Sequence, residues 1–378
     1  MNKLIKWSAL ALLFATGSAL FAQEKEEEKT IYEFTETVNV KHTPVDNQGS
    51  SGTCWCFAGT GFIEAEILRM YGKELNLSEM YLVRHAWEEK VVKYVKMHGC
   101  NTLSQGGEVI DALLMLDRYG MMPDDEYTGK VIGETKHMHG EMNEVITNFA
   151  KSVTKRSNGK LTPTWQKAMP GILDAYLGEV PENFTFEGKK HTPKSFANAY
   201  KLNLDDYIEI ASFTDQPLNK PFMVEIPDNW TWTPAYNLEF DKLFEALDHA
   251  LEQGYTVGWA QDVSDKGFSR KLGVAIVAED FEDPKLWEEV VPEKTITAED
   301  HQKAYDNWET TDDHSMLIVG IAKDQNGTKY YKVKNSWGDA GPYKGYWYCS
   351  ESFVKLHTVF FTLHKDALPK AIRKNLGL

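Results

Sequence analysis

The longest helical pattern in the chain directly follows a polar loop that is interrupted by glycines. The loop ends near Thr53, and apolar residues then recur at the spacing of one helix face. The buried stripe that this spacing predicts consists of Phe57, Phe62, Ile63, Ile67, Leu68 and Tyr71. We therefore predict a core helix that begins close to Cys54.

Further helical patterns follow. The next one ends at Gly120, with Pro123 just beyond it, as helices commonly do. Its apolar face consists of Val109, Leu113, Leu114 and Leu116. Additional helical pieces, separated by Pro and Gly, lie between residues 136 and 255. The pattern predicts a helical lobe over 41–135 and a mainly helical insertion over 136–255.

The last third of the chain changes to strand patterns. Runs of β-branched and aromatic residues, broken by turns, occupy residues 255–263, 271–279, 315–324, 328–337, 345–350 and 358–366. Asn326 and Gly327, between two of these runs, are a strong hairpin signal. Residues 31–40 alternate and predict an extended arm. The expected fold class is α+β, with a β-rich lobe of mostly antiparallel strands over 256–378.

The N-terminus has the pattern of an export signal. Lys3 and Lys6 precede an apolar run, and Ala22 is a small residue at a suitable cleavage point. A retained membrane anchor is the alternative, but the run is short for a bilayer and a charged stretch follows it directly. We expect a signal peptide over 1–22, then an acidic leader and N-terminal arm over 23–40. The sequence leaves open whether the leader is a propeptide. The protein should be exported: periplasmic in a Gram-negative bacterium, secreted otherwise.

The chain is strongly acidic. It has 56 Asp and Glu against 41 Lys and Arg, a formal charge of -15. Loss of the two lysines of the export signal makes this charge about -17. Such a surface repels phosphate backbones and anionic lipids. We expect no nucleic-acid partner and no stable membrane association.

The cysteines and histidines do not form a recognisable metal site. Only four cysteines are present, at positions 54, 56, 100 and 349. If Cys54 stays free, the other three allow at most one disulfide, and the sequence leaves its partners open. No metal-ligand spacing occurs, so we expect neither a metal nor a cofactor. His137 and His139 imitate a ligand pair, but exposed or loop histidines are the better interpretation.

Cys54 is the residue with the clearest chemical potential. It lies where the glycine-rich loop meets the predicted helix, and the free backbone N–H groups and the helix dipole at that end favour a negative charge. A thiol there loses its proton more easily, and the thiolate is the attacking species. It needs a base that can return the proton to a leaving amine, a task for which histidine is suited.

The loop QGSSGTCW, from Gln48 to Trp55, resembles the nucleophile loop of papain-like cysteine peptidases in both spacing and residue type. DDHSMLIVGI, around His314, and KVKNSWG, around Asn335, resemble the other signatures of that family. The resemblance implies that Cys54 is the nucleophile, His314 its base and Asn335 the residue that holds the imidazole tautomer. Gln48 and the Cys54 backbone N–H would stabilise the oxyanion.

The same resemblance suggests substrate-binding residues. Gly106 and Gly107 would leave room for substrate backbone beside the cleft wall, although a simple turn before a helix would also explain them. Trp337 would line the site and shield the imidazole–amide bond from water. Cys56 should face inward as a small apolar residue rather than act in catalysis or redox chemistry. The disulfide that many papain relatives carry in this loop is absent, because Ser51 stands at the equivalent position.

Separations along the chain narrow the resemblance to one group. His314 and Asn335 follow Cys54 by 260 and 281 residues, whereas roughly 130–150 is usual in small papain-like enzymes. With phrases such as LDHALEQGYTVGWAQDVSDKGF, this layout resembles the bleomycin hydrolase and bacterial aminopeptidase C group. The group implies a papain-like two-lobe fold, a hexameric ring, and a C-terminal tail in the cleft that restricts cleavage to peptide N-termini. Here only the short tail ALPKAIRKNLGL follows the last strand pattern.

We therefore expect an exported thiol aminopeptidase that acts on short peptides, with a homo-hexamer as the assembly implied by the group. A papain-like endopeptidase is the nearest alternative. An acyl-transferring enzyme would use the same Cys, His and Asn, and an inactive peptide-binding scaffold would keep the fold. The sequence leaves these alternatives, the side-chain preference and the natural substrate open.

Overall fold

The computed structural model describes residues 31–155 and 159–378. The predicted signal peptide and the first part of the leader lie outside the described residues. Within them, no helix is both long enough and apolar enough to cross a membrane. Residues 31–378 form one unit.

Helices dominate this unit up to residue 200, and strands dominate it afterwards. The helices are α1 (Cys54–Tyr71), α2 (Glu79–Lys96), α3 (Val109–Tyr119), α4 (Gly140–Thr154), α5 (Thr164–Leu177), α6 (Pro193–Tyr200), α7 (Phe240–Glu252), α8 (Ala298–Asp306), α9 (Glu351–His357) and α10 (Lys370–Leu376). The strands are β1 (Thr35–Asn39), β2 (Phe184–Phe186), β3 (Lys189–His191), β4 (Tyr207–Ala211), β5 (Pro221–Met223), β6 (Pro234–Asn237), β7 (Val257–Gln261), β8 (Phe268–Ser269), β9 (Val274–Ala275), β10 (His314–Lys323), β11 (Lys329–Lys334), β12 (Tyr346–Ser350) and β13 (Thr358–His364). The expected α+β class is confirmed.

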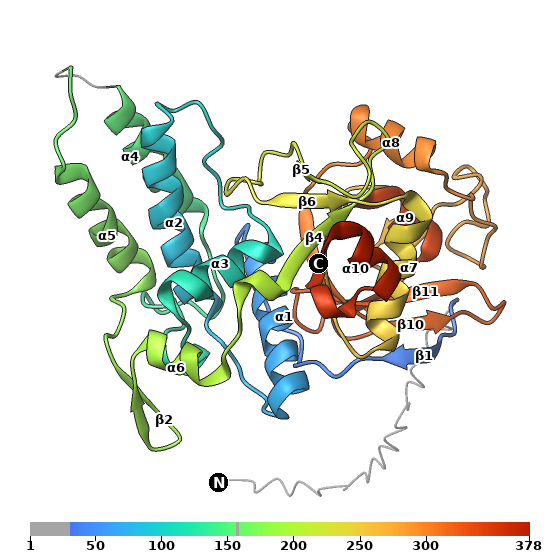
Figure 1. Cartoon of the computed structure of the whole chain (residues 1–378), viewed down its shortest axis with the longest axis horizontal. Helices are drawn as coiled ribbons and strands as arrows, with labels where there is room; N and C mark the ends of the chain where they lie inside the picture. The colour runs from blue at the N-terminus through green and yellow to red at the C-terminus, as the bar shows by residue number, and fades with distance from the viewer. Residues whose placement is uncertain (1–30, 156–158) are drawn as a thin grey trace, which may run out of the picture. The chain divides into compact units, whose positions relative to one another are not determined.

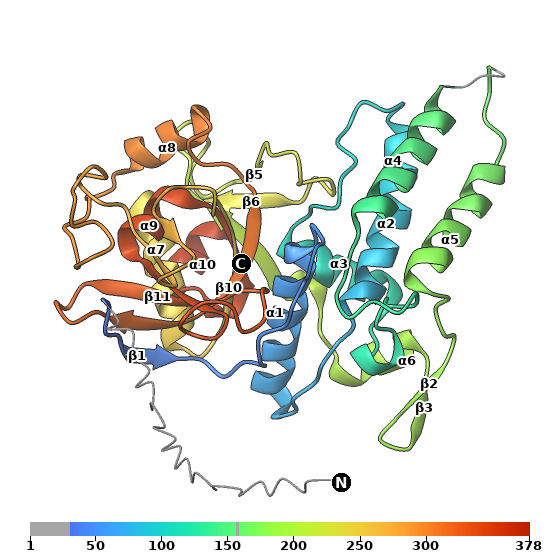
Figure 2. The same ribbon diagram turned by 180° about the vertical axis from the view of Figure 1, so that it is seen from behind.

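One large sheet organises the second part of the unit. Its strand order is β5-β6-β4-β13-β7-β10-β11-β12-β9-β8. β1 pairs with the second half of β10, beyond the stretch that pairs with β7. The pairs are antiparallel except β4 with β6 and β9 with β12. The predicted hairpin is confirmed as β10 and β11, with Asn326 and Gly327 in the turn. Figure 1 shows α2, α4 and α5 side by side away from this sheet, and Figure 2 shows the same layer from behind.

Strand β10 separates two hydrophobic cores. Leu317 and Val319 pack with the core of α1, α2 and α3, whereas Met316 and Ile318 belong to the core that contains α7, α9 and α10. The two sets alternate because successive side chains of a strand point to opposite faces. A strand covered on both faces is expected to be continuously apolar, as this one is from Met316 to Ala322. β10 is thereby held firmly between the helical part and the β-rich part.

Helix α1 begins at Cys54, as predicted. The Thr53 carbonyl accepts the backbone N–H groups of Cys56 and Phe57 at 2.9 and 3.2 Å, and no side chain caps this end. In the middle of the helix, Gly59 faces α3 so closely that an added Cβ would lie 2.4 Å from the Cβ of Ala112. This close approach, together with the contact with β10, sets the position of the helix tip that carries Cys54.

The predicted apolar stripe on this helix was wrong in part. All residues of α1 from Trp55 to Ile67 are buried, and Tyr71 is 45% exposed. The reason is that β10, α2 and α3 surround the first turns of α1, so the helix has no solvent face there, whereas its last turn projects beyond them.

The region 136–255 contains more strand than the pattern suggested. Its helices α4 to α7 are accompanied by β4, β5 and β6, which join the main sheet through the pairing of β4 with β13. The pattern missed these strands because they are short and interrupted by polar residues. The lobe and insertion boundaries themselves stay predictions.

Candidate active site

The nucleophile candidate lies at the contact between α1 and β10. Cys54 is the first residue of α1 and is half-buried, and His314 is the first residue of β10. Burial raises the pKa of the Cys54 thiol to about 12. Hydrogen bonds from the backbone N–H groups of Ser315 and Trp55 oppose this shift, but they do not cancel it. Ser315 directly follows His314, so the fold brings the thiol to the start of the strand that carries the histidine.

His314 and Asn335 are hydrogen-bonded to each other. The imidazole Nε2 lies 2.8 Å from the amide Oδ1 of Asn335, which directly follows β11. The antiparallel pairing of β10 with β11 brings them together. Leu317 of β10 lies opposite Lys334 of β11, so His314 at the start of β10 and Asn335 just after β11 lie at the same open end of the hairpin. An amide oxygen only accepts, so Nε2 carries the hydrogen and Nδ1 of the neutral ring has the free lone pair.

Burial favours the neutral forms of Cys54 and His314. Burial lowers the pKa of His314 to about 4, while the hydrogen bond to Asn335 opposes this shift and the charge of Arg270 adds to it. Because the thiol pKa is raised and the imidazole pKa is lowered, neutral thiol and neutral imidazole are the favoured resting forms. The sequence argument anticipated a thiolate favoured by the helix end, and it did not anticipate how strongly burial opposes that charge.

Gln48 is tied to the same network through Ser336. The Ser336 hydroxyl donates to Gln48 Oε1 at 2.6 Å, and the Ser336 backbone N–H donates to Asn335 Oδ1 at 2.7 Å. The Gln48 amide nitrogen donates to the Ser51 carbonyl at 2.7 Å, which leaves one of its two hydrogens for another acceptor. Ser336 was missed as a functional residue although it lies inside the KNSWG motif, because its link to Gln48 spans 288 residues.

Trp337 covers the imidazole. Its ring centroid lies 5.1 Å from that of His314, with the two planes inclined by 35°. On the same indole lies the guanidinium of Arg270, 4.7 Å from the ring centroid. Trp337 therefore lies beside the imidazole, and the substrate-binding and shielding roles assigned to it stay predictions. Arg270 gave no signal in the sequence.

The two predicted glycines lie just before α3. Gly107 is buried against Trp55, so close that an added Cβ would be 3.2 Å from the indole. At Gly106 an added Cβ would lie 1.8 Å from a carboxylate oxygen of Asp228. Both positions therefore require glycine for packing, and the substrate role assigned to them stays a prediction.

The remaining cysteines lie outside this network. All four cysteines are free. Cys56 is fully buried, as predicted, and its thiol donates to the Glu79 carbonyl at 3.3 Å. Cys349 is buried in β12, and Cys100 is exposed.

The expectation for the two histidines of the HMH sequence was wrong in one respect. His137 and His139 lie in the loop before α4, but they are only 6% and 4% exposed. Burial lowers the pKa of each to about 4. Among the described residues, no group of three or more potential ligand side chains could hold a metal ion.

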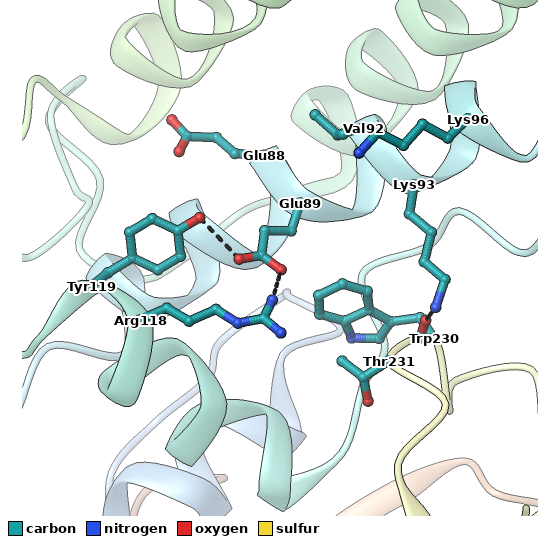
Figure 3. Close-up of a pocket in the computed structure, with 9 residues that line it drawn as sticks. All are labelled: Glu88, Glu89, Val92, Lys93, Lys96, Arg118, Tyr119, Trp230 and Thr231. Atoms are coloured by element: carbon teal, nitrogen blue, oxygen red, sulfur yellow. Dashed lines mark hydrogen bonds and ion pairs between the residues drawn. The ribbon is translucent and has the colours of Figure 1, made fainter. Parts of the chain in front are cut away.

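A cavity of about 450 Å³ lies away from Cys54. Figure 3 shows its lining residues, which come from α2, the end of α3 and the segment at Trp230 and Thr231. Its Glu89 is already engaged, because it pairs with Arg118 and accepts the Tyr119 hydroxyl at 2.9 Å. Without a cysteine in its lining, this cavity is not the site of the thiol chemistry.

The C-terminal tail leaves the sheet at the end remote from His314. Thr358, the first residue of β13, pairs with Gln261, and Gln261 pairs with His314. β13 then runs away from this end, and the tail folds into α10, which buries Ile372 and Leu376 in the core of the β-rich part. The tail is therefore packed on that part of the molecule.

These observations define the class of protein. A helical part presents a cysteine at a helix tip, and a sheet supplies the histidine and the asparagine. The solved structure of PepW from Lactobacillus rhamnosis has the same fold, with a TM-score of 0.71 at 22% identity over 91% of this chain and 84% of that one. The expected papain-like two-lobe fold is thus confirmed.

Sequence comparison defines the family. Residues 11–377 match the profile of the Peptidase C1-like family, and the chain belongs to this family. Aminopeptidase C of Lactobacillus delbrueckii subsp. lactis is 25% identical to it, over 95% of this chain and 88% of the relative. Aminopeptidase C of Lactococcus lactis subsp. cremoris is also 25% identical, over 88% of this chain and 83% of the relative. The protein is therefore a cysteine peptidase, and the resemblance to the aminopeptidase C group is confirmed.

Proposed function

We propose that this peptidase is an aminopeptidase that cleaves short peptides through a Cys54–His314–Asn335 mechanism. The observation that carries the proposal is the hydrogen bond between His314 and Asn335 at the start of the strand against which α1 presents Cys54. It orients the free lone pair of the imidazole, and a base with a defined tautomer is what a neutral thiol needs in order to react.

The reaction starts from the neutral pair. His314 Nδ1 takes the thiol proton as the Cys54 sulfur attacks the carbonyl carbon of the scissile bond. The imidazolium is stabilised by Asn335, which accepts from the opposite nitrogen. When the tetrahedral intermediate collapses, the C–N bond breaks and Nδ1 returns the proton to the leaving amine. A water molecule then gives a proton to the same nitrogen and attacks the thioester carbonyl. The C–S bond breaks, the carboxylic acid leaves, and the proton returns from Nδ1 to the Cys54 sulfur.

Gln48 is proposed as the donor to the oxyanion. Ser336 holds the amide by its oxygen at 2.6 Å, so the amide cannot turn its oxygen toward the developing negative charge. The Gln48 amide uses one of its two N–H hydrogens in the bond to Ser51. The other N–H and the Cys54 backbone N–H would be the two donors to the oxyanion. Removing one such donor typically lowers kcat by about 10²- to 10³-fold.

The preference for peptide N-termini rests on the relatives, which are named Aminopeptidase C. The decisive test compares an amino-acyl fluorogenic amide that has a free amino group with its N-acetylated twin. We expect hydrolysis of the free-amino substrate and little of the acetylated one. A preference for the acetylated substrate would make the enzyme an endopeptidase.

The nucleophile is tested by Cys54→Ala, with Cys100→Ala as the matched control because Cys100 is exposed. We expect Cys54→Ala to abolish turnover and labelling by an irreversible thiol inhibitor, with an unchanged thermal unfolding midpoint. Cys100→Ala should keep full activity. Residual turnover in Cys54→Ala at the level of the wild type would exclude Cys54 as the nucleophile.

Export is proposed from residues 1–22 alone. The sequence of the mature N-terminus after expression in a Gram-negative host tests it. We expect a chain that begins at or near Gln23 in the periplasmic fraction. An intact Met1 in the cytoplasmic fraction would contradict export.

A further inference from the structure

The peptide group between Ser51 and Gly52 is held at both ends by glutamine side chains. Its carbonyl, that of Ser51, accepts the amide nitrogen of Gln48 at 2.7 Å. Its N–H, that of Gly52, donates to Oε1 of Gln105 at 2.9 Å, across 53 residues of chain. Because the peptide group is planar, any turn of its N–H also turns its carbonyl. Gln105 therefore acts on the group that Gln48 contacts.

Gly52 makes this second bond important. A residue without a Cβ offers little resistance to rotation of the peptide plane beside it. The Gln105 side chain also packs over this position, since a Cβ added at Gly52 would lie 3.1 Å from the Cβ of Gln105. No disulfide joins the two segments, because all four cysteines are free. The orientation of the plane at its N–H end thus depends on Gln105.

Gln105 also contacts the nucleophile loop on the other side of Cys54. Its backbone carbonyl accepts the indole N–H of Trp55 at 2.9 Å. Gly52 precedes Cys54 by two residues and Trp55 directly follows it. One residue of the segment before α3 therefore bonds to the loop both before and after the nucleophile.

A buried lysine fixes the backbone of Gln105. Lys90 of α2 is only 4% exposed, and its ammonium donates to the carbonyls of Ser104 and Gln105 at 3.3 Å each and to that of Gly106. These three bonds use all three of its N–H donors. The Gln105 side chain therefore reaches the nucleophile loop from a backbone that is anchored to α2.

The series of hydrogen bonds continues from the peptide group to the imidazole. Gln48 Oε1 accepts the Ser336 hydroxyl at 2.6 Å, the Ser336 N–H donates to Asn335 at 2.7 Å, and Asn335 contacts His314 at 2.8 Å. The Gln48 amide lies in the middle of this series. Its oxygen is held by Ser336 and its nitrogen by the peptide carbonyl, so the direction of its remaining N–H depends on both. Gln105 determines the second of these contacts.

We propose that Gln105 is a positioning residue for the oxyanion donor: it fixes the peptide group that directs the remaining N–H of Gln48 toward the charge of the tetrahedral intermediate. The inference rests on the proposed donor role of Gln48 and assigns Gln105 no contact with the substrate. A donor contributes most when it is already aimed at the place where the charge develops. Loss of this aim weakens the transition state and not the bound substrate, so kcat should fall while KM changes little.

The test uses Gln105→Met, which keeps the length of the side chain and its packing but removes the acceptor. Gln48→Ala removes the donor itself, and a double variant combines the two changes. Gln325→Met is the matched control, since Gln325 also accepts a backbone N–H from a distant segment, that of Glu33 at 3.1 Å, but in the turn between β10 and β11. For the full-length enzyme, kcat and KM are measured on an amino-acyl fluorogenic amide and its N-acetylated twin. Thermal unfolding of each variant checks the fold.

Alkylation by iodoacetamide separates the aim of the donor from the position of the thiol. The Cys54 sulfur displaces iodide from a saturated carbon, a C–S bond replaces the C–I bond, and no oxyanion forms. The rate is followed on the peptide that contains Cys54, because Cys100 is exposed as well. A residue that only kept the loop folded would slow alkylation and hydrolysis together.

We expect Gln105→Met to lower kcat about 3- to 10-fold, the factor that corresponds to one neutral hydrogen bond, with KM and the Cys54 alkylation rate within about twofold of the wild type. Gln48→Ala should lower kcat by about 10²- to 10³-fold. Adding Gln105→Met to Gln48→Ala should change kcat less than about twofold, because Gln105 acts through Gln48. Gln325→Met should keep kcat within about twofold of the wild type, since its bond lies outside the network.

The outcomes separate this inference from the donor role on which it rests. If Gln48→Ala lowers kcat and Gln105→Met does not, the assignment of Gln105 is overturned and the donor role stands. Losses that multiply in the double variant would also overturn it, because Gln105 would then act independently of Gln48. Alkylation that slows as much as hydrolysis would reduce Gln105 to a residue that keeps the loop folded. A wild-type kcat in Gln48→Ala overturns the donor role and the Gln105 assignment together.

Discussion

The imidazole of His314 and the amide of Asn335 are joined by a 2.8 Å hydrogen bond although 21 residues separate them in the chain. The same Asn335 oxygen accepts the Ser336 N–H at 2.7 Å, while its amide nitrogen is buried and has no partner among the described residues. The side chain thus serves as an acceptor only. This arrangement fixes which nitrogen of the neutral ring carries the hydrogen.

The first prediction concerns this acceptor. Asn335→Ala should lower kcat by about 10- to 100-fold, because a hydrogen bond to an ionising ring contributes about 1.5–3 kcal/mol. Asn335→Asp keeps the acceptor and loses no bond at the unpartnered nitrogen. It should retain more activity, with the acidic limb of the kcat/KM profile moved to higher pH, since a carboxylate stabilises the imidazolium. Equal losses in both variants, measured over the pH profile, would exclude the orienting role.

The second prediction concerns the packing that positions Cys54. Gly59→Ala places a methyl group 2.4 Å from the Ala112 Cβ, so α1 and α3 must separate. We expect a loss of about 1–3 kcal/mol in the free energy of unfolding, measured by urea titration. Gly171→Ala in α5 is the control, because an added Cβ there meets no atom within 4 Å. It should stabilise the protein by about 0.4–1 kcal/mol. Changes of the same sign in both variants would contradict the close packing of α1 on α3.

The third prediction concerns pH. The pKa of His314 is about 4 in the folded protein and 6.5 in the absence of burial. As pH falls from 6.5 to about 4, the unfolded chain takes up a proton that the folded chain does not. The wild type should therefore lose stability relative to His314→Gln, by about 1 kcal/mol per pH unit.

A buried carboxyl group provides the control of opposite sign. Burial raises the pKa of Glu64 to about 7 from 4.5, against the hydrogen bonds from Thr43 and the Leu77 N–H. Between these pH values the folded chain keeps a proton that the unfolded chain releases. The wild type should lose stability relative to Glu64→Gln as pH rises through this window. Urea titrations from pH 4 to pH 7 measure both differences, and slopes of one sign would contradict the assigned protonation states.

Much of the site could be predicted because its signals are local. The change from a glycine-rich loop to helical spacing located the start of α1 at Cys54, and Asn326 with Gly327 located the β10–β11 hairpin. His314 and Asn335 lie at the open end of that hairpin, so their proximity follows from one local pairing. Tyr71 was assigned to a buried stripe because periodicity alone does not show where neighbouring elements end.

The sequence by itself determined the residue types of the site, the elements that carry them and the family. Only the tertiary structure decided that Ser336 connects Gln48 to Asn335, that Arg270 lies on Trp337, and that Asp228 packs on Gly106. The physical reason is that periodicity and turn signals act over a few residues. Contacts between segments separated by 60 to 290 residues depend instead on how the sheet and the helices pack, and no local pattern records that packing.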